Sequence, residues 1–167
     1  MRLFIAINFD DHTRSRLVAL QDELRSYSER GGFVSPESLH LTLVFLGECN
    51  DLQTENIKRI MDETSFELFN MQFEKLGRFK RDYGDIWWVG VHENPTLLDL
   101  QRSLSDKLIR AGFSLDRKKY TPHITLARKV VTTMSPRQTE VFKQTVSRID
   151  LIKSERINGV LTYSSIH

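Results

Sequence analysis

Two short segments place a histidine and a threonine two residues apart within an apolar run. The first reads His40-Leu41-Thr42-Leu43, and the second reads His123-Ile124-Thr125-Leu126. In a β-strand, residues two apart point to the same face, so each histidine shares a face with its threonine. The apolar residues form the other face, which comprises Leu39, Leu41, Leu43 and Phe45 in the first segment and Ile124 and Leu126 in the second. The sequence therefore predicts two strands, each of which holds a polar pair on an apolar backing.

Two imidazoles in one site would suit a reaction in which one proton is removed and another is delivered. Histidine titrates at about pH 6.5, so one ring can be neutral and accept a proton while the other is charged and donates one. Cleavage of a phosphodiester needs both transfers, and the hydroxyls of Thr42 and Thr125 can hydrogen-bond to phosphate oxygens. We therefore take His40 and His123 as the candidate catalytic pair and the two threonines as candidate phosphate ligands.

Arg128 follows the second segment and is the natural source of positive charge for the phosphate. Its planar guanidinium matches the oxygens of a phosphate group. Strict alternation along the strand would place Arg128 on the apolar face, away from His123 and Thr125. The strand must therefore end or bulge before Arg128 if this side chain is to reach the phosphate.

A single His-x-Thr segment has a plainer interpretation, because most such histidines are half-buried structural residues with satisfied hydrogen bonds. Repetition of the segment at matching places in the chain favours the catalytic interpretation. Neither segment has carboxylates or cysteines at a spacing that suits metal ligands. We therefore expect neither a metal ion nor a cofactor in this site.

Similar elements are expected before the two segments. Before the first, the pattern predicts a strand over residues 3–9, a helix capped by Asp10-Asp11 that runs to about residue 28 and is stopped by Gly31-Gly32, and a strand over residues 39–46. Before the second, it predicts a strand over residues 86–91, a helix from Asn94-Pro95 to Gly112, and a strand from residue 123 to 127. We infer an internal duplication of about residues 3–47 and 86–128.

The remaining elements complete a single domain over residues 1–167. They are a helix over residues 52–63, a strand over 69–76, a basic loop over 78–81, a helix from Ser135-Pro136 to about residue 147, and strands over 149–153 and 160–166. No glycine-rich phosphate loop is present. We predict a bilobal α+β fold with two pseudo-symmetric, largely antiparallel sheets flanked by helices, and with the active-site groove between them.

Composition excludes several classes of protein. Of the 167 residues, 40% are hydrophobic and 28% are charged, which is typical of globular domains. The formal charge of +2 is too small for a protein that holds duplex DNA by charge alone. The single cysteine, Cys49, suits a reducing compartment, and no apolar run approaches the ~18 residues of a membrane span. We expect a cytoplasmic protein without membrane contact, and a monomer because no coiled-coil pattern is present.

The segments Ser38-Leu39-His40-Leu41-Thr42-Leu43-Val44-Phe45-Leu46-Gly47 and Thr121-Pro122-His123-Ile124-Thr125-Leu126-Ala127-Arg128 resemble the two signature motifs of the two-histidine phosphoesterases. More narrowly, they resemble the RNA 2′,3′-cyclic phosphodiesterases, also called 2′-5′ RNA ligases. Gly77-Arg78-Phe79 and Trp87-Trp88-Val89-Gly90-Val91 also fit that pattern. The proline expected after the Gly-x-Phe of this family is absent here.

The resemblance implies metal-independent hydrolysis of an RNA 2′,3′-cyclic phosphate to a 2′-phosphomonoester, with ATP-independent 2′-5′ ligation as a related reaction. It implies that His40 protonates the departing 3′ oxygen and that His123 activates water, although pseudo-symmetry permits the opposite assignment. Thr42, Thr125 and Arg128 would hold the phosphate. Candidate RNA contacts are Arg78, Phe79 and Tyr120, with Lys80, Arg81 and the basic residues 117–119 along the groove. The alternative interpretation is a solvated basic loop and buried aromatic side chains.

Two other functions stay open from the sequence. The first is a phosphodiesterase of the same superfamily that acts on 2′-5′ oligonucleotides or on a small nucleotide cyclic phosphate, for which the catalytic residues would be the same. The second is a non-catalytic module that binds RNA ends. It predicts RNA affinity without turnover, and the intact histidines of both segments argue against it.

Overall fold

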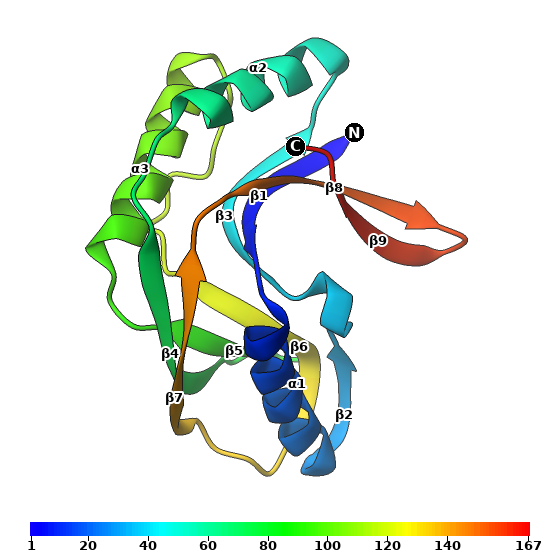
Figure 1. Ribbon diagram of the computed structural model, residues 1–167. Helices are drawn as coiled ribbons and strands as arrows, with labels where there is room; N and C mark the ends of the chain where they lie inside the picture. Colours follow the sequence, from blue (N-terminus) through cyan, green and yellow to red (C-terminus); the bar gives the residue numbers. More distant parts are fainter.

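Two antiparallel β-sheets form the body of the protein, and the two His-x-Thr segments lie in different sheets (Figure 1). The computed structural model describes all 167 residues of the chain. The elements, in chain order, are β1 (Arg2–Asn8), α1 (Asp11–Ser26), β2 (Ser28–Phe33), the 3-10 turn η1 (Pro36–Ser38), β3 (His40–Glu48), α2 (Asp51–Glu63), β4 (Phe69–Phe79), β5 (Asp85–Val91), α3 (Pro95–Arg110), β6 (His123–Thr132), β7 (Arg137–Val146), β8 (Asp150–Ile157) and β9 (Val160–Ser165). The prediction of an α+β fold with largely antiparallel sheets is confirmed.

The order of the strands places one segment on an edge strand of its sheet and the other on an internal strand. The four-stranded sheet has the order β3-β1-β8-β9, so β3, which carries His40, is an edge strand. The five-stranded sheet has the order β2-β6-β5-β4-β7, so β6, which carries His123, is flanked on both sides. Each segment is paired with the strand that precedes it in its predicted repeat, β3 with β1 and β6 with β5.

One continuous hydrophobic core joins the two sheets. Leu41 and Leu43 of β3 and Ile124 and Leu126 of β6 are all buried in it, together with Trp87 of β5. The four leucine and isoleucine residues of β3 and β6 are those that the alternating pattern assigned to the apolar faces. Burial of these faces in a shared core leaves the opposite faces, which carry the histidines and threonines, available for a site.

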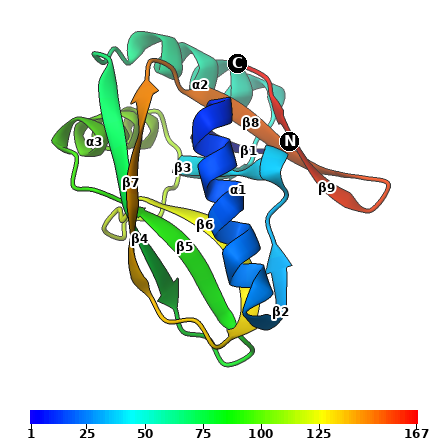
Figure 2. The same ribbon diagram turned by 60° about the horizontal axis from the view of Figure 1, so that its bottom comes forward.

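The helices begin at residues whose side chains cap them. Two of the helices pack against strands of the other predicted half. The Asp10 carboxylate accepts a 2.8 Å hydrogen bond from the Thr13 amide at the start of α1, and Asn94 caps α3 in the same way. The helix α1 packs on β2, β6 and β7 (Figure 2), whereas α3 packs on α2, β3 and β4. Each of these helices therefore lies against the strand that carries the other half's His-x-Thr segment. No helix is long and apolar enough to cross a membrane.

The hairpin of β8 and β9 projects from the body of the molecule (Figure 1). Its two-residue turn is Asn158-Gly159, and both residues have positive φ, 52° and 78°. Asparagine and glycine tolerate this conformation, which a tight hairpin turn requires. The hairpin is therefore specified locally by its turn.

Three local predictions are wrong. The helix predicted from Ser135-Pro136 is the strand β7, in which Phe142, Gln144 and Val146 alternate into the core against β4. The Ser-Pro pair is a helix-start signal, but the two-residue period that follows it decided the structure. Gly31-Gly32 does not stop a helix, because α1 ends at Ser26 and the glycines lie in the exposed strand β2. Arg78 and Phe79 belong to β4 and not to a loop.

Candidate active site

Side chains of both His-x-Thr segments line one cavity of about 760 Å³. Its lining includes His40 and Thr42 from β3, and His123, Thr125 and Arg128 from β6. The structure thus brings together all five residues that the sequence nominated for catalysis and phosphate binding. A cavity of this size accommodates a mononucleotide-sized ligand.

A β-bulge follows the threonine of each segment. In β3, Thr42 pairs with Ala6 and Val44 with the adjacent Ile5, so Leu43 is the extra residue. In β6, Thr125 pairs with Trp88 and Ala127 with the adjacent Trp87, so Leu126 is the extra residue.

An inserted residue reverses the alternation of the side chains beyond it. Arg128 is thereby turned to the face of His123 and Thr125, as the sequence required if it was to reach a phosphate. The bulge in β3 turns Phe45 into the cavity in the same way, and its side chain is 72% exposed.

The ring of His40 is held through both nitrogens. Nδ1 lies 2.7 Å from the carbonyl oxygen of Ser38, and Nε2 lies 2.9 Å from the hydroxyl of Thr42. A carbonyl only accepts, so Nδ1 carries a hydrogen, and in the neutral ring Nε2 accepts from the threonine hydroxyl. The ring packs on Phe4 and Tyr163, with centroid distances of 4.8 and 5.3 Å. Burial lowers the pKa of His40, and the hydrogen bond to Ser38 opposes this effect.

His123 is anchored in a matching way. Its Nδ1 lies 2.8 Å from the carbonyl oxygen of Thr121, which is again the residue two positions earlier. The neutral ring therefore has the same tautomer as His40, with Nε2 as the free acceptor. Phe79 meets the ring edge-on at 5.3 Å, and Trp88 lies at 6.2 Å. In both halves, then, a backbone carbonyl and two aromatic side chains orient the imidazole.

The segment Gly77-Arg78-Phe79 supports His123 from behind. A Cβ atom on Gly77 would lie 2.3 Å from the indole of Trp88, so only glycine leaves room for this ring. Phe79 packs on the same indole at 5.3 Å and on His123. The Gly-x-Phe pattern noted in the sequence therefore builds the aromatic wall behind the imidazole.

The candidate RNA contacts are placed differently from one another. Arg78 and Phe79 do not line the cavity, and Arg78 lies 3.8 Å from the carboxylate of Asp85. Tyr120 does line it, but its hydroxyl donates a 2.7 Å hydrogen bond to the carbonyl oxygen of Thr42. Burial strongly raises the pKa of Tyr120, so its phenol stays neutral and able to donate. Contact of these three residues with RNA stays a prediction.

Other cavity residues were predicted only in part from the sequence. Lys118 and Lys119 of the basic stretch line the cavity, whereas Lys80 and Arg81 do not. Phe45 and Tyr163 were missed. Alternation without a bulge assigned Phe45 to the core, and no sequence signal relates Tyr163 of β9 to His40.

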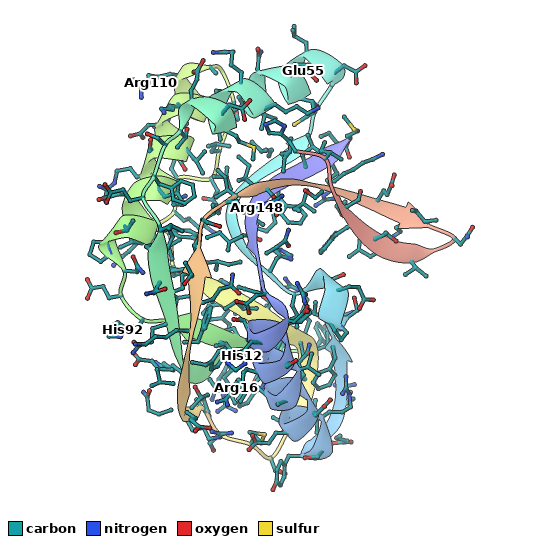
Figure 3. The ribbon with its side chains drawn as sticks, viewed as in Figure 1. His12, Arg16, Glu55, His92, Arg110 and Arg148 are labelled. Carbon is teal, nitrogen blue, oxygen red and sulfur yellow. The ribbon has the colours of Figure 1, made fainter.

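The three remaining histidines lie outside this site. Figure 3 shows His12 on α1 and His92 beyond the end of β5, both on the outer surface. His92 contacts Glu74, and the terminal His167 contacts Asp62. No group of three or more His, Cys, Asp or Glu side chains is arranged to hold a metal ion.

Comparison with known proteins gives consistent relatives. The model of the 2′-5′ RNA ligase superfamily matches residues 9–158. The RNA 2′,3′-cyclic phosphodiesterase of Methanothermobacter thermautotrophicus is 32% identical and is aligned over 93% of this chain and 90% of its own. The protein of the same name from Archaeoglobus fulgidus is 36% identical, over 77% of this chain and 72% of its own.

Solved structures share the whole fold. A protein from Thermus thermophilus superposes with a TM-score of 0.87 and 25% identity, and covers 100% of this chain and 96% of its own. Escherichia coli LigT in complex with 3′-AMP superposes with a TM-score of 0.86 and 22% identity, covering 99% of this chain and 95% of its own. Since the family model spans most of the sequence and the curated relatives exceed 30% identity, this chain belongs to the 2′-5′ RNA ligase superfamily.

Proposed function

We propose that this protein hydrolyses the 2′,3′-cyclic phosphate at the 3′ end of RNA to a 2′-phosphomonoester. The observation that carries the proposal is the pair of imidazoles, His40 and His123, whose Nδ1 atoms are anchored in the same way and which line one cavity with a threonine from each segment. The curated relatives that carry the name RNA 2′,3′-cyclic phosphodiesterase support the same substrate.

In the proposed reaction, the phosphate lies between the two imidazoles. The hydroxyls of Thr42 and Thr125 and the guanidinium of Arg128 bind its non-bridging oxygens and stabilise the charge that develops on them. Water attacks phosphorus as the bond to the 3′ oxygen breaks. One imidazole removes the proton from water, and the other delivers a proton to the 3′ oxygen, which leaves the phosphate on the 2′ oxygen.

The direction of proton transfer is part of the proposal. Family resemblance gives His40 the role of the acid, whereas its lowered pKa in the free protein favours the neutral, basic form. A bound phosphate carries negative charge beside His40 and so raises its proton affinity again. We propose His40 as the acid of the substrate complex and His123 as the base.

A substrate with a sulfur atom in place of the 3′ oxygen tests this assignment. A departing thiolate needs no proton, so a variant that lacks the acid should regain activity on it, whereas a variant that lacks the base should not. We expect the sulfur substrate to rescue His40→Ala and not His123→Ala. The opposite pattern would reverse the two roles.

The related ligation reaction uses the same chemistry. A 5′-hydroxyl of a second RNA replaces water as the nucleophile, the same bond to the 3′ oxygen breaks, and a 2′-5′ phosphodiester forms. The cyclic phosphate supplies the activated bond, so the reaction consumes no ATP. We propose this activity as a second outcome at the same site.

The defining experiment offers the chelator-treated protein an RNA that ends in a 2′,3′-cyclic phosphate and identifies the product. We expect the 2′-phosphate, and we expect either single variant, His40→Ala or His123→Ala, to lose about a hundredfold or more of the activity. A wild-type rate in either variant would exclude the two-histidine mechanism. A requirement for added metal would exclude the metal-independent part of the proposal.

A substrate panel separates the rival functions. Hydrolysis of a linear 2′-5′ dinucleotide or of a small nucleotide cyclic phosphate would use the same cavity and the same histidines. Preferential turnover of either compound would show that the protein is a phosphodiesterase of the same superfamily with a different substrate. Binding of RNA ends without turnover of any of them would identify a non-catalytic module.

A monomeric state and a cytoplasmic location stay predictions. Size-exclusion chromatography tests the first, and cell fractionation tests the second.

A further inference from the structure

Two glutamine side chains hold the two β-bulges beside the site. The amide nitrogen of Gln21, on α1, donates a 3.0 Å hydrogen bond to the carbonyl oxygen of Leu126, the extra residue in β6. The amide nitrogen of Gln101, on α3, donates a 3.3 Å hydrogen bond to the carbonyl oxygen of Leu43, the extra residue in β3. Each glutamine therefore contacts the residue that follows the threonine of a His-x-Thr segment.

These contacts cross between the two predicted halves. Gln21 belongs to the half that carries His40 but contacts β6, whereas Gln101 belongs to the half that carries His123 but contacts β3. The sequence around them matches, since Leu20-Gln21-Asp22-Glu23-Leu24 and Leu100-Gln101-Arg102-Ser103-Leu104 share a Leu-Gln-x-x-Leu pattern. The leucines pack into the core and so direct both glutamines towards the strands.

A bulge needs such a contact more than a regular strand does. The extra residue disrupts the ladder of hydrogen bonds, so the bulged backbone depends on contacts from outside the ladder. The Leu126 carbonyl also accepts a 3.0 Å hydrogen bond from the Val34 amide, and Gln21 is its second donor. The Gln21 amide also donates a 2.7 Å hydrogen bond to the carbonyl oxygen of Val34, and this side chain is only 2% exposed. Gln101 also donates to the hydroxyl of Ser105 at 3.1 Å. Both amides are thus fixed in orientation.

The bulges determine which side chains face the cavity. In β6, the bulge turns Arg128 to the face of His123 and Thr125, and in β3 it follows directly after Thr42. We infer that Gln21 and Gln101 are positioning residues, each of which fixes the phosphate-binding groups of the opposite half from its own helix. This inference rests on the proposed function, because it assigns those groups to phosphate.

The two glutamines are not equivalent in strength. Gln21 is fully buried and joins two backbone carbonyls, whereas Gln101 is half-buried and forms the longer bond. Loss of the Gln21 amide should therefore displace Arg128 more than loss of the Gln101 amide displaces Thr42. A displacement of about 1 Å at a reacting group can cost on the order of a hundredfold in rate.

The experiment combines Gln21→Leu with Arg128→Ala in a double-mutant cycle. We expect Gln21→Leu to lower kcat/KM on the cyclic-phosphate RNA by about tenfold to a hundredfold, and to weaken the binding of inorganic phosphate measured by titration. In the Arg128→Ala background, the same change should have little further effect, because the group it positions is gone. Equal losses in both backgrounds would overturn the inference, as would wild-type kcat/KM in Gln21→Leu.

Gln144→Leu is the matched control. Gln144 is also a buried glutamine that donates to a main-chain carbonyl, that of Asn8, at 2.9 Å, but it contacts neither bulge. We expect Gln144→Leu to lower Tm. The fraction of the variant that stays folded should bind phosphate as tightly as the wild type does. An equal loss of phosphate affinity in Gln144→Leu would mean that Gln21 acts only through general stability, which would also overturn the inference.

Two further measurements keep the outcomes separable. If Gln21→Leu does not fold, Gln101→Leu replaces it, with Thr42→Val as the second member of the cycle. If the wild-type protein does not turn over the RNA, the proposed function fails, but the phosphate titration still reads out the position of Arg128. A change in phosphate affinity in the glutamine variant would then support the inference alone, and an unchanged affinity would refute it.

Discussion

The hydroxyl of Tyr120 donates a 2.7 Å hydrogen bond to the main-chain carbonyl of Thr42. Tyr120 lies three residues before His123, so this bond ties the approach to the second His-x-Thr segment to the strand that carries the first. Burial strongly raises the pKa of the phenol, which keeps it protonated and donating at any physiological pH. The bond therefore links the two segments directly.

Tyr120→Phe removes only the donor and keeps the ring. We expect the variant to lose about 1–3 kcal/mol of stability, because a buried carbonyl loses a partner, and to lose several-fold in kcat through looser spacing of the imidazoles. Thermal unfolding and steady-state kinetics measure the two effects. Tyr83→Phe is the control, since Tyr83 is 82% exposed and should tolerate the change without effect. Unchanged kcat in Tyr120→Phe would leave the bond with a structural role only.

The sequence predicted the starts of two helices well, because their signals are local. Asp10 and Asn94-Pro95 start helices through their own side chains and rings, so both starts could be read directly. The turn at Asn158-Gly159 carries an equally local signal, but it was not predicted, and the strand before it runs to Ile157 and not to residue 153. The prediction of a helix after Ser135-Pro136 was wrong. There, a helix-start signal is followed by a segment whose structure depends on pairing with β4, more than sixty residues away in the chain.

The site was predictable to the extent that its chemistry required it. The need to bring a cation to the phosphate required the strand to end or to bulge before Arg128, and the strand pairing shows a bulge. Nothing in the sequence required the matching bulge at Leu43, so Phe45 was assigned to the wrong face. The contacts of Tyr120 and Gln21 join elements far apart in sequence, and only the packed structure brings them together.

Acid should destabilise the protein through His40. Because burial lowers its pKa, the folded state binds a proton on His40 less well than the unfolded state does. The stabilising contribution is therefore fully present above the ordinary histidine pKa of 6.5 and is lost as the pH falls from 6.5 through the lower pKa of the folded state. We expect Tm to fall between about pH 7.5 and pH 5 by less in His40→Gln than in the wild type.

The pH dependence of Tm can also be measured in the presence of inorganic phosphate. A bound anion beside His40 favours its charged form, so saturating phosphate should reduce the acid sensitivity of the wild-type Tm. His40→Gln should show no such reduction. Identical pH dependence of Tm in the two proteins, with and without phosphate, would mean that His40 does not carry this linkage.

Gly77→Ala should disrupt the wall behind His123. The added methyl group would lie 2.3 Å from the Trp88 indole, which is too short for any contact, so the ring or the strand must move. We expect a loss of about 1–3 kcal/mol, a change in tryptophan fluorescence and lower kcat. Gly32→Ala is the stability control, since a Cβ atom there meets only ordinary contact at 3.6 Å. A wild-type Tm in Gly77→Ala would contradict the packing described.

Arg128→Lys separates charge from geometry at the phosphate. Lysine keeps the positive charge but lacks the planar fork that binds two phosphate oxygens at once. If the bulge at Leu126 serves to present that fork, Arg128→Lys should lose most of what Arg128→Ala loses, on the order of tenfold or more in kcat/KM. Values of kcat/KM over a range of salt concentrations measure the contribution of the charge and that of the geometry. Full activity in Arg128→Lys would show that only charge is needed, and the bulge would then serve to bring a cation to the groove without fixing its orientation.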